Sequence, residues 1–173
     1  MKRSKGSWWS DPAAHEIFAV NQLLEDHPDV LITKLISGKV TFVHRKLWPQ
    51  LLAVATARES WQLSDLSVEA KSLLRELDKA GSLSTDRTTK SPVSKVGETA
   101  RELELKLLIH SEQIHTKSGT HAKLIETWES WTSRVNYHCG LPDSFKARRS
   151  LESRLDKVNE EYCGSGRLPW TTI

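Results

Sequence analysis

The side chains of this sequence with the clearest chemical potential lie close together between positions 115 and 123. Two histidines, His115 and His121, alternate there with two lysines, Lys117 and Lys123, around a Ser-Gly pair. Lysine and protonated histidine attract phosphate oxygens, and the histidine charge grows on acidification. Two histidines are also half of a metal site, but the spacing supplies no third ligand, so we expect no metal here. We interpret the group as a compact basic surface that suits a phosphate backbone; a solvated surface without a ligand is the alternative.

The two cysteines suggest a different chemistry. Cys139 and Cys163 do not form a C-x-x-C sequence, and with His138 they supply three potential zinc ligands. Structural zinc sites use four ligands at close spacing. Two cysteines in 173 residues are also too few for a disulfide-built scaffold. We therefore expect two reduced thiols, with no metal and no cofactor.

No catalytic motif accompanies these residues. The sequence has no G-x-S-x-G, H-E-x-x-H, P-loop or G-x-G-x-x-G, and we predict no catalytic residue. Its 25 lysines and arginines against 22 aspartates and glutamates give a net charge of +3, too small to indicate a nucleic-acid binder by itself. No apolar run approaches the roughly 20 residues of a membrane span. No apolar stretch follows the basic start at residues 1–5 either, so we expect a cytoplasmic protein without a membrane partner.

The basic group must be positioned by the elements around it. Residues 109–116 and 120–125 have the composition of two strands, and the loop between them ends in Gly119. A three-residue loop of this kind fits a type I turn followed by a bulge. In that register His115 faces His121, whereas Ile114, Ala122 and Leu124 share the opposite face. We therefore predict a hairpin with one apolar face and one polar, basic face.

Two helices are predicted before this hairpin. Ser67 caps the first, Gly81 ends it, and its apolar face predicts burial. A short extended piece follows, and residues 85–94 have the composition of a loop. The second helix covers about residues 95–108. Three further basic residues come from this region and are predicted to assist the hairpin: Arg87, Lys90 and Lys95.

The second of these helices has an unusual outward side. The residues opposite its apolar face are Lys95, Glu98, Arg101, Glu102, Leu105 and Lys106. Phosphates repel the acids, which we expect to pair with the arginine and lysine of the same side. Burial of the apolar Leu105 side chain is more favourable than its exposure to water. This helix is therefore a poor recognition helix, and we expect another segment, such as the final helix, or a partner to cover part of it.

The flanking regions are predicted to be mainly helical. Residues 11–58 form a unit with a helix to about residue 26, a short helix over 28–38, a strand over 39–44 and a further helix from Leu47. Asp143 caps a final helix over residues 143–162 whose apolar stripe is Leu151, Leu155, Val158 and Tyr162. That helix suits either packing across the body or pairing with a partner. The tail after Cys163 is predicted to be flexible, with Trp170 packed back onto the body.

The order helix, strand, helix and hairpin over residues 63–132 is that of a winged helix. The fragment 97–104, continuing into 107–110, resembles the last helix and first wing strand of such domains. The chain resembles a group of bacterial winged-helix proteins of unassigned function. Residues 37–43 and 47–49, followed by a winged helix, are also similar to the middle of AlkZ-like crosslink-repair DNA glycosylases, over about residues 30–132. The glutamine-x-glutamine type motif of those enzymes is absent here, so the resemblance implies the fold and DNA contact but not glycosylase chemistry.

The sequence thus predicts a mainly α fold with a small β-hairpin: a winged helix between an N-terminal helical unit and a long C-terminal helix. The predicted function is non-catalytic DNA binding, as a transcription regulator or a DNA-repair accessory. The predicted DNA-binding residues are Arg87, Lys90, Lys95, His115, Lys117, His121 and Lys123. The alternative is a protein-interaction adaptor that uses the winged helix structurally and forms a homodimer or binds a protein partner through its C-terminal helix.

Overall fold

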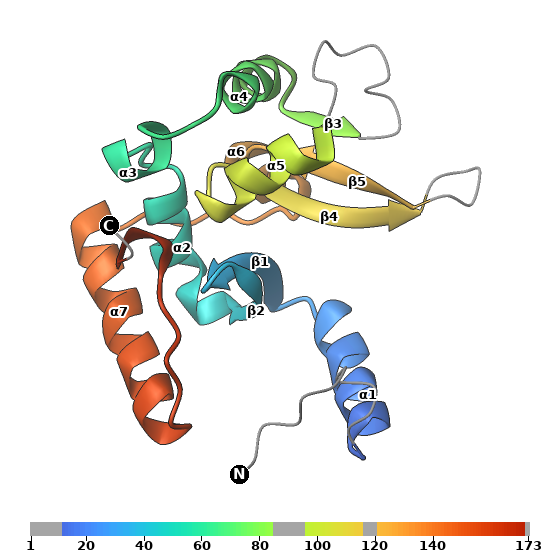
Figure 1. Cartoon of the computed structure of the whole chain (residues 1–173), viewed down its shortest axis with the longest axis vertical. Coiled ribbons are helices and arrows are strands. Elements are labelled where there is room, and N and C mark those ends of the chain that lie inside the picture. The colour runs from blue at the N-terminus through green and yellow to red at the C-terminus, as the bar shows by residue number, and fades with distance from the viewer. Residues whose placement is uncertain (1–11, 85–95, 116–120, 172–173) are drawn as a thin grey trace.

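The computed structural model describes residues 12–84, 96–115 and 121–171 (Figure 1). Within these ranges the chain is mostly helical and has two small antiparallel sheets. The helices are α1 (Ala14–Glu25), α2 (Trp48–Ala55), α3 (Ser60–Leu63), α4 (Val68–Ala80), α5 (Val96–Leu105), α6 (Trp128–Arg134) and α7 (Ser144–Glu161). The strands are β1 (Val30–Ile36), β2 (Lys39–His44), β3 (Ser82–Ser84), β4 (His110–His115) and β5 (His121–Glu126). None of the described helices combines the length and apolar character needed to cross a membrane.

The helix predicted over residues 28–38 is wrong, because this segment is strand β1. Its side chains alternate between buried and half-buried along the strand, which is the period of a sheet. Ser37 and Gly38 both have positive φ angles, 53° and 66°, and join β1 to β2. A two-residue turn with two positive φ angles is the tight hairpin connection that matches strand twist. The predicted strand over 39–44 is confirmed as the partner of β1.

Two clusters of buried residues form the interior. One contains α2, the first strands and five tryptophans: Trp48, Trp61, Trp128, Trp131 and Trp170. The other lies between α4, α5 and the three-stranded sheet, and it includes the predicted face of α4. Leu107 belongs to the first cluster and Leu108 to the second, so the connection from α5 to β4 joins the two.

The C-terminal helix α7 lies along α2 (Figure 1). Asp143 caps it, as predicted, by accepting a hydrogen bond from the amide of Lys146 at 3.0 Å. Only half of the predicted stripe is buried: Leu151 and Leu155 lie in the core, whereas Val158 and Tyr162 are exposed. The prediction that α7 packs across the body is therefore confirmed for its first three turns.

The tail after α7 is held against the body rather than extended freely. The amide of Gly166 donates to the side chain of Asn159 at 2.8 Å, and the indole of Trp170 donates to Glu152 at 2.9 Å. The prediction of a flexible end is wrong over residues 163–171, because these hydrogen bonds and the burial of Trp170 fix the tail. The expected packing of Trp170 is confirmed.

The second sheet has the strand order β3-β5-β4, with both pairs antiparallel. Gly81 ends α4, as predicted, with φ at 75°, and its carbonyl accepts from the amide of Thr127 at 2.9 Å. This bond joins the end of α4 to the start of α6. The tight passage from α4 into β3 therefore depends on a residue that adopts positive φ without strain.

Replacing Gly81 with alanine is expected to lower the free energy of unfolding by at least about 1–2 kcal/mol, the strain of a left-handed non-glycine residue. A Cβ atom there would also lie 2.6 Å from the hydroxyl of Ser130, which must move. Urea denaturation measures the loss. The matched control is Gly140→Ala, where a Cβ meets no atom within 4 Å. Equal stability of the two variants would contradict this account of the α4 end.

Candidate nucleic-acid interface

The hairpin predicted to carry the basic surface is present. β4 and β5 pair antiparallel, and His115 lies opposite His121, so the predicted register is confirmed. The side chains of these two histidines lie outside the described residues. So do four other predicted DNA-binding residues: Arg87, Lys90, Lys95 and Lys117. Lys123 is the one member of the predicted set whose side chain the structure describes.

Lys123 lies on β5 with its side chain 40% exposed. Its ammonium nitrogen is 3.8 Å from a carboxylate oxygen of Glu104 on α5. The pair joins a partly exposed ammonium group to a buried carboxylate. The carboxylate offsets part of the positive charge of this lysine.

The predicted division of the hairpin into an apolar and a basic face is wrong near its base. Ile125, two residues from Lys123 on the same face, is fully buried in the cluster under α4 and α5. On the other face, two polar residues at the end of the ladder, His110 and Glu126, are buried as well. Both faces therefore contact the body at the base of the hairpin, and neither is purely polar or apolar.

The attachment points of the basic segments lie on one side of the molecule. β3 ends at Ser84, which pairs with Leu124, three residues from the end of β5 that carries His121. The end of β3, the start of α5 and the open end of the hairpin all lie at the right of Figure 1. The segments that carry the four basic residues outside the described ranges therefore begin and end on this side.

One acid of α5, Glu102, is already bound within the protein. The carboxylate of Glu102 accepts hydrogen bonds from the amide and the hydroxyl of Ser67, both at 2.7 Å. Lys106 donates to the carbonyl of Trp61 at 2.9 Å. The predicted pairing of Glu102 with a basic residue of its own helix is therefore wrong, because the start of α4 is packed against α5 and competes for the carboxylate.

Glu104 is a second occupied acid. This buried carboxylate accepts from the ammonium group of Lys34 on β1 and from the hydroxyl of Ser111 on β4. With Lys123 it thus has partners on three different strands. A carboxylate paired with cations inside the protein repels an approaching phosphate much less than a free one.

Part of α5 is covered, but by a different segment from the one expected. Leu105 is half-buried, and its Cδ2 atom would lie 2.8 Å from a Cβ atom placed on Gly38. The turn between β1 and β2 therefore lies against the outward side of α5. The final helix is the example of a covering segment that the sequence suggests. The prediction that α5 is partly covered is confirmed in its general form.

A polar network lies at the base of the hairpin. The Nδ1 atom of His110 is 3.1 Å from Glu126, whose carboxylate also accepts from Arg134 on α6 at 2.6 and 3.2 Å. Arg134 extends to Glu112 at 2.8 Å. The ring of His110 lies 5.7 Å from the rings of both Trp128 and Trp131. The network thus connects β4, β5 and α6 beneath the basic hairpin.

Electrostatics stabilise the charged form of Glu126. Burial alone raises the pKa of this carboxyl, but hydrogen bonds from His110 and Arg134, together with the charge of Arg134, outweigh it and hold the pKa below its ordinary value. The guanidinium of Arg134 in turn has a raised pKa, chiefly through its hydrogen bond to Glu126. Both partners therefore remain charged at neutral pH.

The same residues include a group with metal-ligand atoms. Donor atoms of His110, Glu112 and Glu126 lie within 4.8 Å of one another. The guanidinium of Arg134 contacts both carboxylates of this group, so an arginine already supplies the positive charge between them. A metal ion would have to displace it. The cluster of these side chains is therefore best described as a satisfied ion-pair network.

The register predicted from the sequence contains a signal for this network. If His115 faces His121, then His110 faces Glu126 across the same ladder, as observed. Opposite charges directly across an antiparallel pair interact favourably. The sequence alone does not reveal the full network, because Arg134 comes from α6, which the register of the hairpin does not place.

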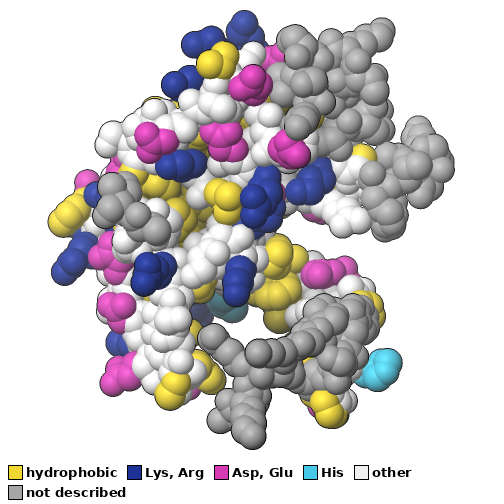
Figure 2. Space-filling view, viewed as in Figure 1, with side chains coloured by type: hydrophobic (Ala, Val, Ile, Leu, Met, Phe, Trp, Pro, Cys, Tyr) yellow, Lys and Arg dark blue, Asp and Glu magenta, His cyan; other side chains and the backbone are white. Residues whose placement is uncertain are grey.

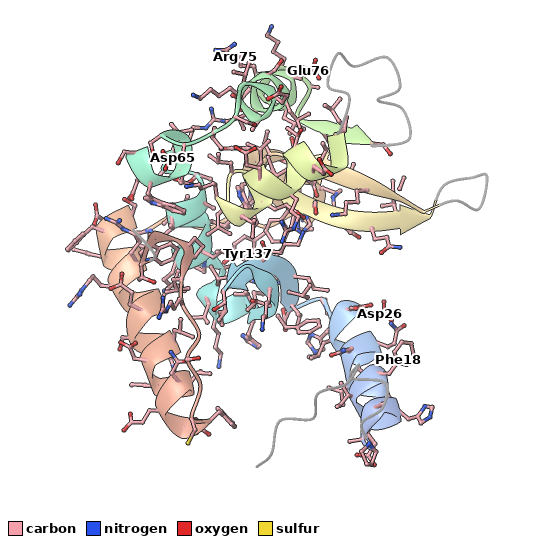
Figure 3. The ribbon with its side chains drawn as sticks, viewed as in Figure 1. Phe18, Asp26, Asp65, Arg75, Glu76 and Tyr137 are labelled. Carbon is pink, nitrogen blue, oxygen red and sulfur yellow. The ribbon has the colours of Figure 1, made fainter. Side chains whose placement is uncertain are left out.

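The cysteines do not form a metal site in the described part of the chain. Cys139 and Cys163 are both exposed free thiols, and the metal-ligand group described above contains neither. Cys139 lines a shallow pocket of about 290 Å³ with Trp128, Leu141 and Tyr137, the last of which is labelled in Figure 3. Burial, together with a hydrogen bond to Cys139, raises the pKa of Tyr137 to about 12. The phenol therefore stays neutral at physiological pH.

Comparisons with known proteins add no assignment. No protein-family model matches this chain, and no curated protein or solved structure is significantly similar to it.

Proposed function

We propose that this protein binds duplex DNA without catalysis, through a winged helix formed by α4, β3, α5, β4 and β5, as a transcription regulator or a DNA-repair accessory. The observation that carries the proposal is the pairing of β3 with β5, which gives the strand order β3-β5-β4. A short strand between two helices that joins the outer edge of a hairpin is the topology of that fold. The resemblance of residues 97–110 to winged-helix domains supports the same interpretation.

The distribution of charge supports a contact at the hairpin side. Figure 2 shows lysine and arginine side chains scattered among acidic ones on the face it presents, without one broad basic patch. The predicted basic residues instead belong to segments attached around the open end of the hairpin. Contact there is mainly with phosphates, since lysine acts as a point charge toward the backbone.

Replacing both hairpin lysines, Lys117→Ala with Lys123→Ala, is expected to weaken binding on every duplex and to flatten its salt dependence. Two lost phosphate contacts reduce the slope of log affinity against log salt by about 2. Fluorescence anisotropy of a labelled mixed-sequence duplex, at low and at near-physiological salt, measures both quantities. The matched control is Lys146→Ala with Lys157→Ala, which removes two exposed lysines from α7.

The control variant loses the same two positive charges as the hairpin variant, so any effect of net charge alone is equal in the two double variants. Equal affinities and slopes for the two double variants would rule out the hairpin as the contact. Absence of binding by the unaltered protein even at low salt would rule out the DNA function as a whole.

The second candidate function is a protein-interaction adaptor. The observation that favours it is the exposed apolar surface on α7, where Val158 is 47% and Tyr162 is 72% exposed. α1 also stands away from the body and carries exposed Phe18 and Leu23 (Figures 1 and 3). Light scattering of the full chain distinguishes the candidates, because an adaptor that pairs through α7 is a dimer. The double variant Val158→Ser with Tyr162→Ser should convert that dimer to a monomer. Removing α7 entirely is not a suitable test, because Leu151 and Leu155 belong to the core.

A further inference from the structure

We propose that DNA bound by this protein is held through its backbone with little reading of base sequence, because half of the helix that would enter the major groove is covered within the chain. The inference rests on the proposed DNA-binding function and specifies its ligand as duplex DNA of any sequence. In helix-turn-helix proteins the second helix of the motif reads base edges in the major groove, and α5 occupies that position. The accessibility of α5 therefore decides how much sequence this protein can read.

The outward side of α5 is closed in its second half. Successive residues of a helix are about 100° apart, so Leu105 lies roughly opposite the buried Ala100 and Leu103. The turn at Gly38 approaches Leu105 so closely that a methyl group on the glycine would be 2.8 Å from it. The major groove is about 12 Å wide and admits a single helix. A helix with a hairpin turn packed on its outer side is too thick to enter at that end.

The covering turn is itself fixed at several points. The amide of Ser37 donates to the carbonyl of Arg167 at 2.7 Å, and the amide of Arg167 donates back to the hydroxyl of Ser37 at 3.1 Å. On the adjoining strand, Lys34 pairs with Glu104 of α5. The turn is thus held between α5 and the C-terminal tail, so uncovering the helix requires breaking contacts on both sides.

The polar side chains of the second half of α5 are engaged as well. Glu102 caps the start of α4 through Ser67, and Glu104 is bound by Lys34 and Ser111. A side chain that reads a base edge must offer its donors or acceptors to the groove. These two carboxylates offer theirs to the protein instead.

The exposed remainder of α5 is about one turn. Its outward residues are Gly97, Glu98 and Arg101, and Arg101 alone among them carries hydrogen-bond donors on its side chain. One arginine at the edge of a duplex suits a phosphate contact, and glycine has no side chain to read with. The side chains of this exposed helical turn therefore suit contact with the DNA backbone rather than recognition of a base sequence.

Selection from a pool of randomised duplexes tests the inference with the full chain. We expect binding at low salt without enrichment of a motif, and affinities for unrelated duplexes of equal length that differ by less than about fivefold, the effect of a single lost base contact. An enriched consensus that binds far more tightly than the pool overturns the inference while the DNA function stands. Absence of any binding overturns the DNA function, and the inference with it.

A variant of Arg101 distinguishes a phosphate contact from a base contact at α5. Arg101→Ala is expected to weaken binding by the same factor on every duplex and to reduce the salt slope by about 1. The matched control is Arg154→Ala, an exposed arginine of α7, which should leave binding unchanged. A loss of more than about fivefold on one sequence and none on others would show that Arg101 reads a base, contrary to the inference.

Discussion

Replacing Trp128 with alanine is expected to lower the free energy of unfolding by about 3–5 kcal/mol. The side chain is 1% exposed, and its ring lies 6.0 Å from that of Trp131 and 5.7 Å from that of His110. Deletion of so large a ring leaves a cavity that the surrounding helices cannot fill. Because a domain of this size is stable by only about 5–15 kcal/mol, the variant should be largely unfolded in mild urea. Circular dichroism against urea concentration measures the change.

A second variant of Trp128 separates packing from hydrogen bonding. The indole nitrogen donates to the carbonyl of Leu107 at 2.8 Å, and Leu107 is fully buried at a positive φ of 53°. Trp128→Phe keeps an aromatic ring but leaves that carbonyl without its donor, at a cost of about 1–3 kcal/mol. Leu23→Ala, on an exposed part of α1, serves as the control and should change stability by less than about 0.5 kcal/mol. A Trp128→Ala protein as stable as the Leu23→Ala control would contradict the proposed role of this ring.

Local sequence signals were sufficient for much of the fold. Ser67 and Gly81 mark the ends of α4 because each satisfies a backbone requirement within the same few residues. The hairpin of β4 and β5 was predictable for the same reason, including its register. The first hairpin was missed although Ser37 and Gly38 fit a tight turn, because the apolar residues before them also match a short helix and periodicity alone does not separate the two.

Contacts between distant parts of the chain were beyond sequence reasoning. Glu102 was expected to pair within its helix, yet its partner Ser67 lies 35 residues away. The partner of Glu104 on β1, Lys34, is 70 residues away. On an isolated helix both acids would pair with basic residues three or four positions away. In the folded chain α4 and β1 pack against α5 and supply other partners for these carboxylates. Knowledge of the tertiary arrangement was therefore needed to see that α5 is partly closed.

The network beneath the hairpin gives the second large effect. Replacing Arg134 with methionine is expected to lower the free energy of unfolding by about 3 kcal/mol at neutral pH, because it leaves the carboxylate of Glu126 buried without its cation. We take the lower end of the range for a broken buried pair, since the side chain of Arg134 is 40% exposed. The double variant with Glu126→Gln should recover much of the loss, because no charge then remains buried. A double-mutant cycle from urea unfolding measures this coupling.

The pH dependence of the Arg134→Met effect has a definite sign. In the unaltered protein the pKa of Glu126 lies below its ordinary value of 4.5, so the charged network stabilises the fold above that pH and is lost as pH falls through the lowered pKa. Removing Arg134 removes a hydrogen bond and a positive charge that lower the pKa of Glu126, so this pKa rises relative to the unaltered protein and protonation costs the folded variant less. The difference in stability between the two proteins should therefore be largest near about pH 7 and should shrink near about pH 4.

The control for this prediction is Arg149→Met, which removes an exposed arginine paired with Glu152 on the surface of α7. Such pairs contribute little, so its effect should stay below about 0.5 kcal/mol at both pH values. An Arg134→Met effect that is independent of pH would mean that the side chain acts through packing and not through its charge on Glu126. A difference that grows toward acid would reverse the sign argued above, and would contradict the assignment of the proton-binding change to Glu126.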